Sequence, residues 1–126
     1  MVWLAILATG CGEEPGRARV KRDEVVGVYE AKFQHGLEKL ELKSDRTYIQ
    51  EFISENGPVY HSGRWTLTNN FFDGSDVVLY GALVSEDEAP GLAPKMGDRT
   101  LNVHRRSGNL TLALNEAADW YFVRAN

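Results

Sequence analysis

The sequence contains a single cysteine, Cys11, so no disulfide can form within the chain and the hydrophobic core must stabilise the fold. It has no apolar run of the roughly 20 residues that a membrane-spanning helix requires, because the apolar stretch that opens the chain covers only residues 1–7. It also has no basic excess, since 14 lysines and arginines face 18 aspartates and glutamates, for a net charge of −4. The missing basic excess argues against nucleic acid as a partner.

Motifs that carry catalysis or metal binding are missing as well. The chain has no glycine-rich phosphate loop, no nucleophile elbow and no zinc-ligand spacing. Its three histidines, His35, His61 and His104, fall on different expected elements, and the acidic residues 86–88 lack the alternating spacing of a calcium loop. We therefore expect no catalytic residues, no metal site and no cofactor, and we do not expect an enzyme.

The folded part of the chain begins near residue 25, where apolar and polar side chains start to alternate. In residues 39–43, for example, leucines alternate with charged residues, which indicates a strand with one face toward a core. Turn residues separate the alternating segments, and no segment carries a convincing helical period. The expected strands cover residues 25–33, 39–43, 47–53, 59–68, 77–84, 100–104, 110–114 and 120–124.

Consecutive strands with mostly short connections predict an antiparallel meander, and a meander that closes on itself has no exposed sheet edges. We therefore predict an all-β domain in which about eight strands form an up-and-down β-barrel, with a two-sheet β-sandwich as the alternative. The connection over residues 85–98 is long and acidic. Because long loops in compact domains often carry recognition, this segment is a candidate binding element.

The first eleven residues resemble the lipobox of bacterial lipoproteins. An apolar stretch is followed by the small residues Ala8, Thr9 and Gly10 and then by Cys11. The resemblance implies a signal peptide over residues 1–10, a lipid on Cys11, and, because Gly12 follows, an outer-membrane location facing the periplasm. The alternative is an apolar N-terminal strand that contains a cysteine. Under the lipoprotein interpretation, residues 11–24 are the lipidated cysteine with a flexible tether, and residues 25–126 are the barrel domain.

Three stretches resemble the lipocalin-like, or calycin, group of small bacterial lipoproteins. They are Gly27-Val28-Tyr29, the run from Leu40 to Tyr48 together with Gly63-Arg64-Trp65, and Arg124 in the last strand. The resemblance implies that Tyr29 and Arg124 meet where the barrel closes. Strand parity permits a cation–π contact between them, because each lies on the apolar face of its own strand.

Large inward side chains determine whether such a barrel is hollow. We expect a mostly filled interior with a shallow apolar mouth, and we expect His61 to be the only inward-facing histidine. The residues that could line a ligand site are Tyr48, Phe52, His61, Trp65, Trp120 and Phe122.

Two functions are compatible with these features. The first is a non-catalytic envelope lipoprotein domain whose surface or long loop binds a protein or another component of the cell envelope. The second, which the lipocalin-like resemblance implies, is a carrier that holds a small hydrophobic ligand in the barrel mouth. In both cases the lipid on Cys11 makes the membrane a partner.

Overall fold

The computed structural model describes residues 16–33, 36–55, 57–70, 74–84, 95–115 and 120–125. In these ranges the chain forms strands and one short helix. In chain order they are β1 (Gly16–Arg17), α2 (Arg22–Val25), β2 (Gly27–Phe33), β3 (Gly36–Leu42), β4 (Thr47–Ser54), β5 (Gly57–Asn70), β6 (Gly74–Val84), β7 (Lys95–Arg106), β8 (Asn109–Asn115) and β9 (Trp120–Arg124).

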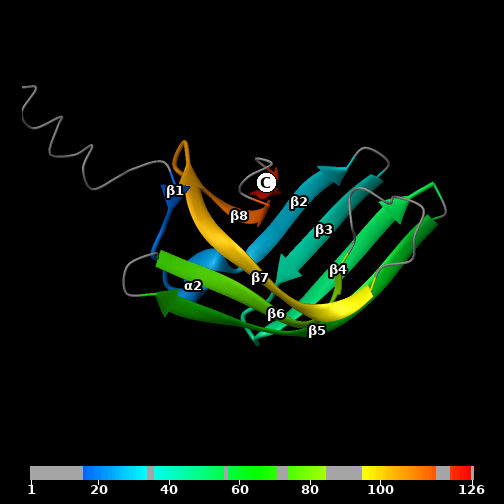
Figure 1. Ribbon diagram of the computed structural model, residues 1–126, viewed down its shortest axis with the longest axis horizontal. Coiled ribbons are helices and arrows are strands. Elements are labelled where there is room, and N and C mark those ends of the chain that lie inside the picture. Colours follow the sequence, from blue (N-terminus) through cyan, green and yellow to red (C-terminus); the bar gives the residue numbers. More distant parts are fainter. Residues whose placement is uncertain are drawn as a thin grey trace, which may run out of the picture.

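The strands β2 to β9 form an antiparallel meander that closes into a barrel (Figure 1). Each strand pairs with the next along the chain, and β9 pairs back with β2 through Tyr29 opposite Arg124 and Glu30 opposite Val123. The prediction of an all-β, eight-stranded up-and-down barrel is therefore confirmed for the described residues. The β-sandwich alternative is wrong, because one continuous sheet curls round instead of two sheets packing face to face.

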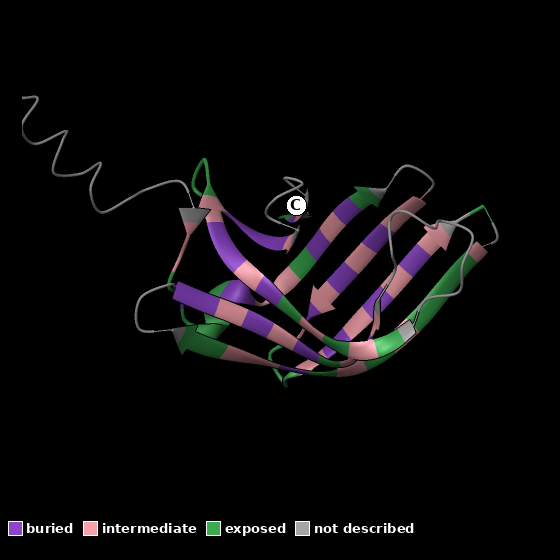
Figure 2. Ribbon diagram, in the orientation of Figure 1, coloured by how far each residue is buried: buried purple, intermediate pink, exposed green. Residues whose placement is uncertain are grey.

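The interior of the barrel is filled by every second side chain of its strands, and buried residues alternate with less buried ones along them (Figure 2). Tyr48 and Phe52 point inward as predicted. Val59 lies on the same face of β5 as the buried Trp65 but is 47% exposed, because this part of β5 has only β4 beside it among the described strands. The core contains Val20, Val25, Tyr29, Ala31, Leu40, Leu42, Tyr48, Trp65, Val77, Leu79, Ala82, Leu101, Val103, Leu110, Leu112 and Phe122.

Residues 16–24 pack against the barrel, so the prediction of a flexible tether is wrong for this part of 11–24. β1 pairs with β7, and beyond it the N–H of Ala18 donates to the carbonyl of Val103 at 2.9 Å. Val20 is 4% exposed and belongs to the core. The polar composition of the segment concealed this apolar anchor. Residues 11–15, including Cys11, lie outside the described residues.

A short helix stands where the expected first strand begins. α2 covers Arg22–Val25, and β2 starts only at Gly27. The carboxylate of Glu24 accepts a hydrogen bond from the N–H of Lys21 at 3.0 Å, which fixes the first turn. Val25 is fully buried and covers one end of the interior. We call this end, where α2 and the segment before it pack, the closed end, and the opposite end the far end (Figure 1).

β6 separates from β5 halfway along the barrel. Pairing between the two strands runs from the closed end to Arg64 opposite Tyr80, and no described residue of β6 pairs with β5 beyond that point. β6 stays paired with β7, with a register shift between Leu79 and Ala82. Gly81 lies in this shift with φ +60°, a left-handed conformation that glycine adopts without strain.

The expected loop over residues 85–98 is shorter than predicted at its C-terminal end. β7 begins at Lys95, so residues 95–98 belong to a strand that pairs with β6. The remainder, residues 85–94, lies outside the described residues, so its role in recognition stays a prediction.

Candidate functional site

Tyr29 and Arg124 meet at the closed end. The guanidinium carbon of Arg124 lies 5.2 Å from the centre of the Tyr29 ring, and its Nη2 donates to the Tyr29 hydroxyl at 2.8 Å. That hydroxyl in turn donates to the carbonyl of Val25 at 2.8 Å. Arg124 also donates to the carbonyl of Val26, so this one side chain connects α2, β2 and β9. Burial raises the pKa of Tyr29, although nearby Arg124 opposes the rise.

The polar aromatic residues expected to line a ligand site are bonded to the main chain of the protein itself. The Tyr48 hydroxyl donates to the carbonyl of Tyr80 at 2.8 Å, and Nε2 of His61 lies 2.6 Å from the carbonyl oxygen of Gly81. Trp65 donates from Nε1 to the carbonyl of Lys43 at 3.0 Å near the closed end. These contacts tie the three side chains to the barrel itself.

The remaining predicted lining residues are apolar. Phe122 is fully buried beneath the guanidinium of Arg99, which lies 5.7 Å from the centre of its ring. Phe52 is 9% exposed and is the cross-strand neighbour of Glu38. Trp120 opens β9, but its side chain is not among those the structure describes.

The far half of the interior contains a polar cluster that the sequence analysis missed. It consists of Glu38, Gln50 and Arg99, and we call it the inner polar cluster. Oε2 of Glu38 accepts from Nη1 of Arg99 and from Nε2 of Gln50, each at 3.0 Å. Glu38 and Gln50 are fully buried. The prediction of an apolar mouth is therefore wrong in this part of the interior.

Gln50 also substitutes for a strand neighbour of β6. Its Nε2 donates to the carbonyl of Leu83 at 3.0 Å, and its Oε1 accepts from the N–H of Leu83 at 2.9 Å. This two-point contact satisfies main-chain groups that a paired β5 would otherwise satisfy. Together with the bonds from Tyr48 and His61, it holds the far half of β6 against inward side chains of β4 and β5.

Glu38 has one unsatisfied carboxylate oxygen. Its Oε1 is buried and has no hydrogen-bond partner among the described residues. Burial raises the pKa of Glu38, while the charge of Arg99 and the bond from Gln50 lower it by less. A buried acceptor without a donor is costly, so this oxygen is a place where a bound molecule could donate a hydrogen bond.

The signal for the inner polar cluster was present in the strand parity. Glu38 lies two positions before the inward Leu40, and Gln50 lies midway between the inward Tyr48 and Phe52. The expected strand began only at Lys39, and its charged residues Lys39 and Glu41 pointed to an outer face. A strict period of two would have placed Glu38 inside.

The separation of β6 leaves one side of β5 without a neighbouring strand among the described residues, and we call that side of residues 57–63 the free edge. Main-chain groups in a strand point alternately to its two sides. The N–H of Trp65 donates toward β4, to the carbonyl of Arg46. The groups of Tyr60 and Ser62, which lie an odd number of residues away, therefore point away from β4, and no described residue pairs with them.

Exposed apolar side chains accompany the free edge. Tyr60 is 66% exposed and Val59 47%, and Tyr80 of β6, where the pairing with β5 ends, is 47% exposed. Pro58 has no N–H, so the amides of Tyr60 and Ser62 are the donors that this edge offers. An unpaired row of N–H and C=O groups is a template for another extended strand.

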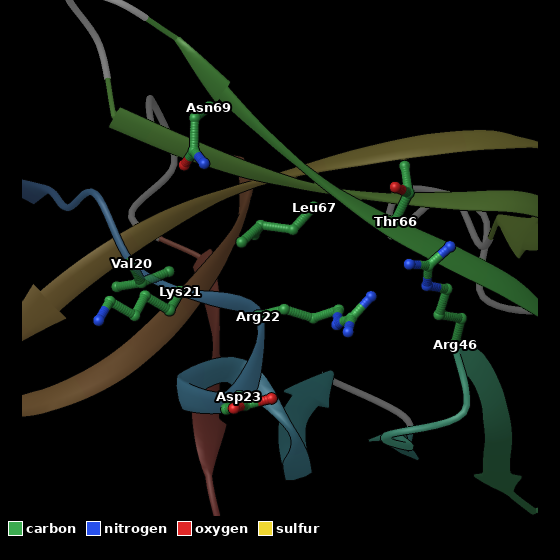
Figure 3. Close-up of a pocket in the computed structure, with 8 residues that line it drawn as sticks. All are labelled: Val20, Lys21, Arg22, Asp23, Arg46, Thr66, Leu67 and Asn69. Carbon is green, nitrogen blue, oxygen red and sulfur yellow. The ribbon is translucent and has the colours of Figure 1, made fainter.

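A second surface feature lies at the closed end. An open depression of about 490 Å³ is lined by Val20, Lys21, Arg22, Asp23, Arg46, Thr66, Leu67 and Asn69 (Figure 3). We call it the basic depression, because three cations and one carboxylate line it. Arg46 and Thr66 also line an adjoining depression that includes Arg64 and Tyr80.

Arg46 holds an unusual backbone conformation at this place. Its φ is +72°, a left-handed value that glycine or asparagine adopts more readily than arginine. The turn is held by Asp45, whose carboxylate accepts from both the N–H and the hydroxyl of Thr47. Figure 3 shows Arg22 extending from α2 toward Arg46. Neither guanidinium has an ion-pair partner among the described residues.

The other two histidines and Cys11 lie apart from these features or outside the described residues. His104 was not expected to face inward, yet it is only 6% exposed. The ring of Tyr121 packs edge-on against it, with 5.2 Å between the two ring centres. His35 and Cys11 lie outside the described residues. In the described ranges no three potential metal ligands gather, and no helix there is long and apolar enough to span a membrane.

Comparisons with known proteins returned no significant match to a family model, to a curated protein or to a solved structure.

Proposed function

We propose that this chain is a non-catalytic envelope lipoprotein domain, tethered through a lipid on Cys11, that binds an extended segment of a protein partner along the free edge of β5. The barrel and the contact between Tyr29 and Arg124 support the lipocalin-like resemblance on which the envelope assignment draws. The single observation that carries the binding function is the free edge itself, where the main-chain groups of Tyr60 and Ser62 point away from β4 and pair with none of the described strands.

The chemistry of the edge specifies the kind of partner. Alternating N–H and C=O groups are matched by the main chain of a strand, which is how β-strand addition works. The exposed Tyr60 and Val59 lie on opposite faces of β5, so side chains from both faces of an added strand would meet apolar surface. The partner is thus a polypeptide that is extended and at least partly apolar where it binds.

Site-directed photo-crosslinking in envelope preparations tests this proposal. A benzophenone amino acid replaces Tyr60 at the edge, or Val28, which is 38% exposed on β2. We expect a crosslinked protein from position 60 that is missing from position 28. The same species from both positions, or none from position 60, contradicts edge binding.

Substitution of Ser62 separates main-chain from side-chain recognition. Ser62→Pro removes one edge N–H, whereas Ser62→Ala keeps it, and neither alters the side of β5 that bonds to β4. We expect crosslinking from position 60 to disappear in Ser62→Pro and to persist in Ser62→Ala.

The anchor is tested separately by mass spectrometry of the native protein, which should show an acylated Cys11 at the mature N-terminus.

A second candidate function is supported by the unsatisfied oxygen of Glu38. A small apolar molecule with one N–H or O–H group could donate to Oε1 while contacting Phe52, which neighbours Glu38 across the strands. The fluorescent probe 1-aminoanthracene has this chemistry. A carrier should enhance its fluorescence, and Glu38→Gln should weaken that binding. If the wild-type protein leaves the probe unchanged and no lipid copurifies, the carrier function is excluded.

A further inference from the structure

From the basic depression at the closed end we infer a binding site for the phosphate of an anionic membrane lipid, so that this end of the barrel rests on the bilayer. The inference extends the proposed function and relies on its N-terminal anchor for the orientation of the barrel. It is independent of the free edge, which lies in the far half of β5.

The charge of the depression selects an anion. Lys21, Arg22 and Arg46 contribute three positive charges and Asp23 one negative charge, in a chain whose net charge is −4. Glu24, the other acidic residue of α2, is turned to Arg105 instead, at 3.5 Å. Phosphate is matched especially well by guanidinium groups, which donate in pairs.

The conformation of Arg46 supports a role for its side chain. A left-handed turn position is normally occupied by glycine or asparagine, and arginine there is strained without any ion pair to offset the strain in the described residues. From this turn Arg46 lines both adjoining depressions. Figure 3 shows that Arg22 reaches toward it from a separate element, so two cations from distant parts of the chain share one space.

The position of the depression points to a lipid as the source of the phosphate. Five residue steps separate Cys11 from Gly16, where β1 begins, and an extended chain spans at most about 18 Å over that length. An acylated Cys11 would therefore hold the closed end close to the membrane surface. Val20 and Leu67 supply an apolar floor next to the cations, which suits the glycerol region below a headgroup.

Vesicle binding of the full chain carrying Cys11→Ser provides the test. The vesicles are phosphatidylcholine with or without phosphatidylglycerol, and every variant has the same apolar N-terminus, so its contribution cancels between variants. Arg22→Gln with Arg46→Asn should lower the partition coefficient onto phosphatidylglycerol vesicles about 25-fold, or about fivefold for each charge at about 1 kcal/mol per basic residue. Asparagine accepts the left-handed turn, so Arg46→Asn should not lower the melting temperature.

The control removes the same charge elsewhere. Lys32→Gln with Lys39→Gln acts on the outer faces of β2 and β3 and should change partition less than about threefold. Equal losses in the two double variants, or no preference for phosphatidylglycerol, would overturn the inference. Displacement by inorganic phosphate beyond that caused by sodium chloride of equal ionic strength would assign the site to a soluble phosphate and overturn the lipid assignment.

The anchor and the depression can fail separately. An unmodified Cys11 in the native protein, with charge-selective vesicle binding intact, removes the anchor but keeps the lipid site. An acylated Cys11, with vesicle binding unaffected by Arg22→Gln and Arg46→Asn, removes the lipid site but keeps the anchor.

Discussion

The side-chain amide of Gln50 bonds to both main-chain groups of Leu83, as donor at 3.0 Å and as acceptor at 2.9 Å. A buried side chain of β4 thereby occupies the hydrogen-bonding positions on β6 that the main chain of β5 would fill in a regularly paired sheet. The diversion of β6 toward the interior and the free edge of β5 are thus two consequences of one set of contacts.

Replacing Gln50 by methionine should destabilise the protein by about 3 kcal/mol, because the two main-chain groups of Leu83 lose their partner at nearly constant side-chain volume. Glu38 would lose one of its two donors as well. Denaturant unfolding of Gln50→Met measures the loss. Ile49→Met, on the half-buried outer face of the same strand, is the matched change and should cost less than about 1 kcal/mol.

Glu38 should make stability depend on pH in a defined direction. Burial raises the pKa of this carboxyl in the folded state above its ordinary value of 4.5, so between the two values the folded protein binds more protons than the unfolded chain. Its contribution to stability is complete below pH 4.5 and is lost as the pH rises through the folded-state pKa. The unfolding free energy of wild type minus that of Glu38→Gln should therefore fall with rising pH. A difference that grows with pH contradicts this assignment.

The hydroxyl of Tyr29 should be coupled energetically to Arg124. Tyr29→Phe removes the hydroxyl that accepts a hydrogen bond from Arg124 and donates one to the carbonyl of Val25. This substitution should lower the free energy of unfolding by about 1–2 kcal/mol. A double-mutant cycle with Arg124→Met should give a coupling energy near 1 kcal/mol. Additive losses would show that the two side chains stabilise the closed end independently.

Gly63 should be intolerant of any side chain. A Cβ at this position would lie 2.6 Å from the hydroxyl oxygen of Tyr48 and 2.7 Å from its Cζ, so the ring would have to move. Gly63→Ala should cost about 1–3 kcal/mol in thermal or denaturant unfolding. Gly97→Ala is the control, because nothing lies within 4 Å of its added Cβ, and it should leave stability nearly unchanged.

Strand parity predicted most of the fold, and its failures have identifiable physical causes. The alternation around Leu40 and Tyr48 placed these side chains inside, and the short connections predicted the meander. The helix α2 was missed because one turn is too short to show a helical period. The polar residues around Val20 concealed its packing against the core.

The candidate sites were harder to predict than the fold. The stretch over residues 77–84 is apolar on both faces, so no periodic signal marks the register shift at Gly81 or the end of the pairing between β5 and β6 beside it. The basic depression joins α2 to the turn at Arg46 and to β5, which are distant in the sequence. By contrast, the inward position of Glu38 followed from parity and was missed because charged neighbours suggested a surface.

Amide hydrogen exchange along β5 shows whether the edge at Tyr60 and Ser62 is open to an added strand. Tyr60 and Ser62 direct their N–H groups to the unpaired side, while those of His61 and Gly63 face β4. Residue-resolved exchange of the isolated protein should therefore be fast at 60 and 62 and at least about 100-fold slower at 61 and 63. Equal protection at all four positions would show that the edge is already paired and would rule out binding of an added strand there.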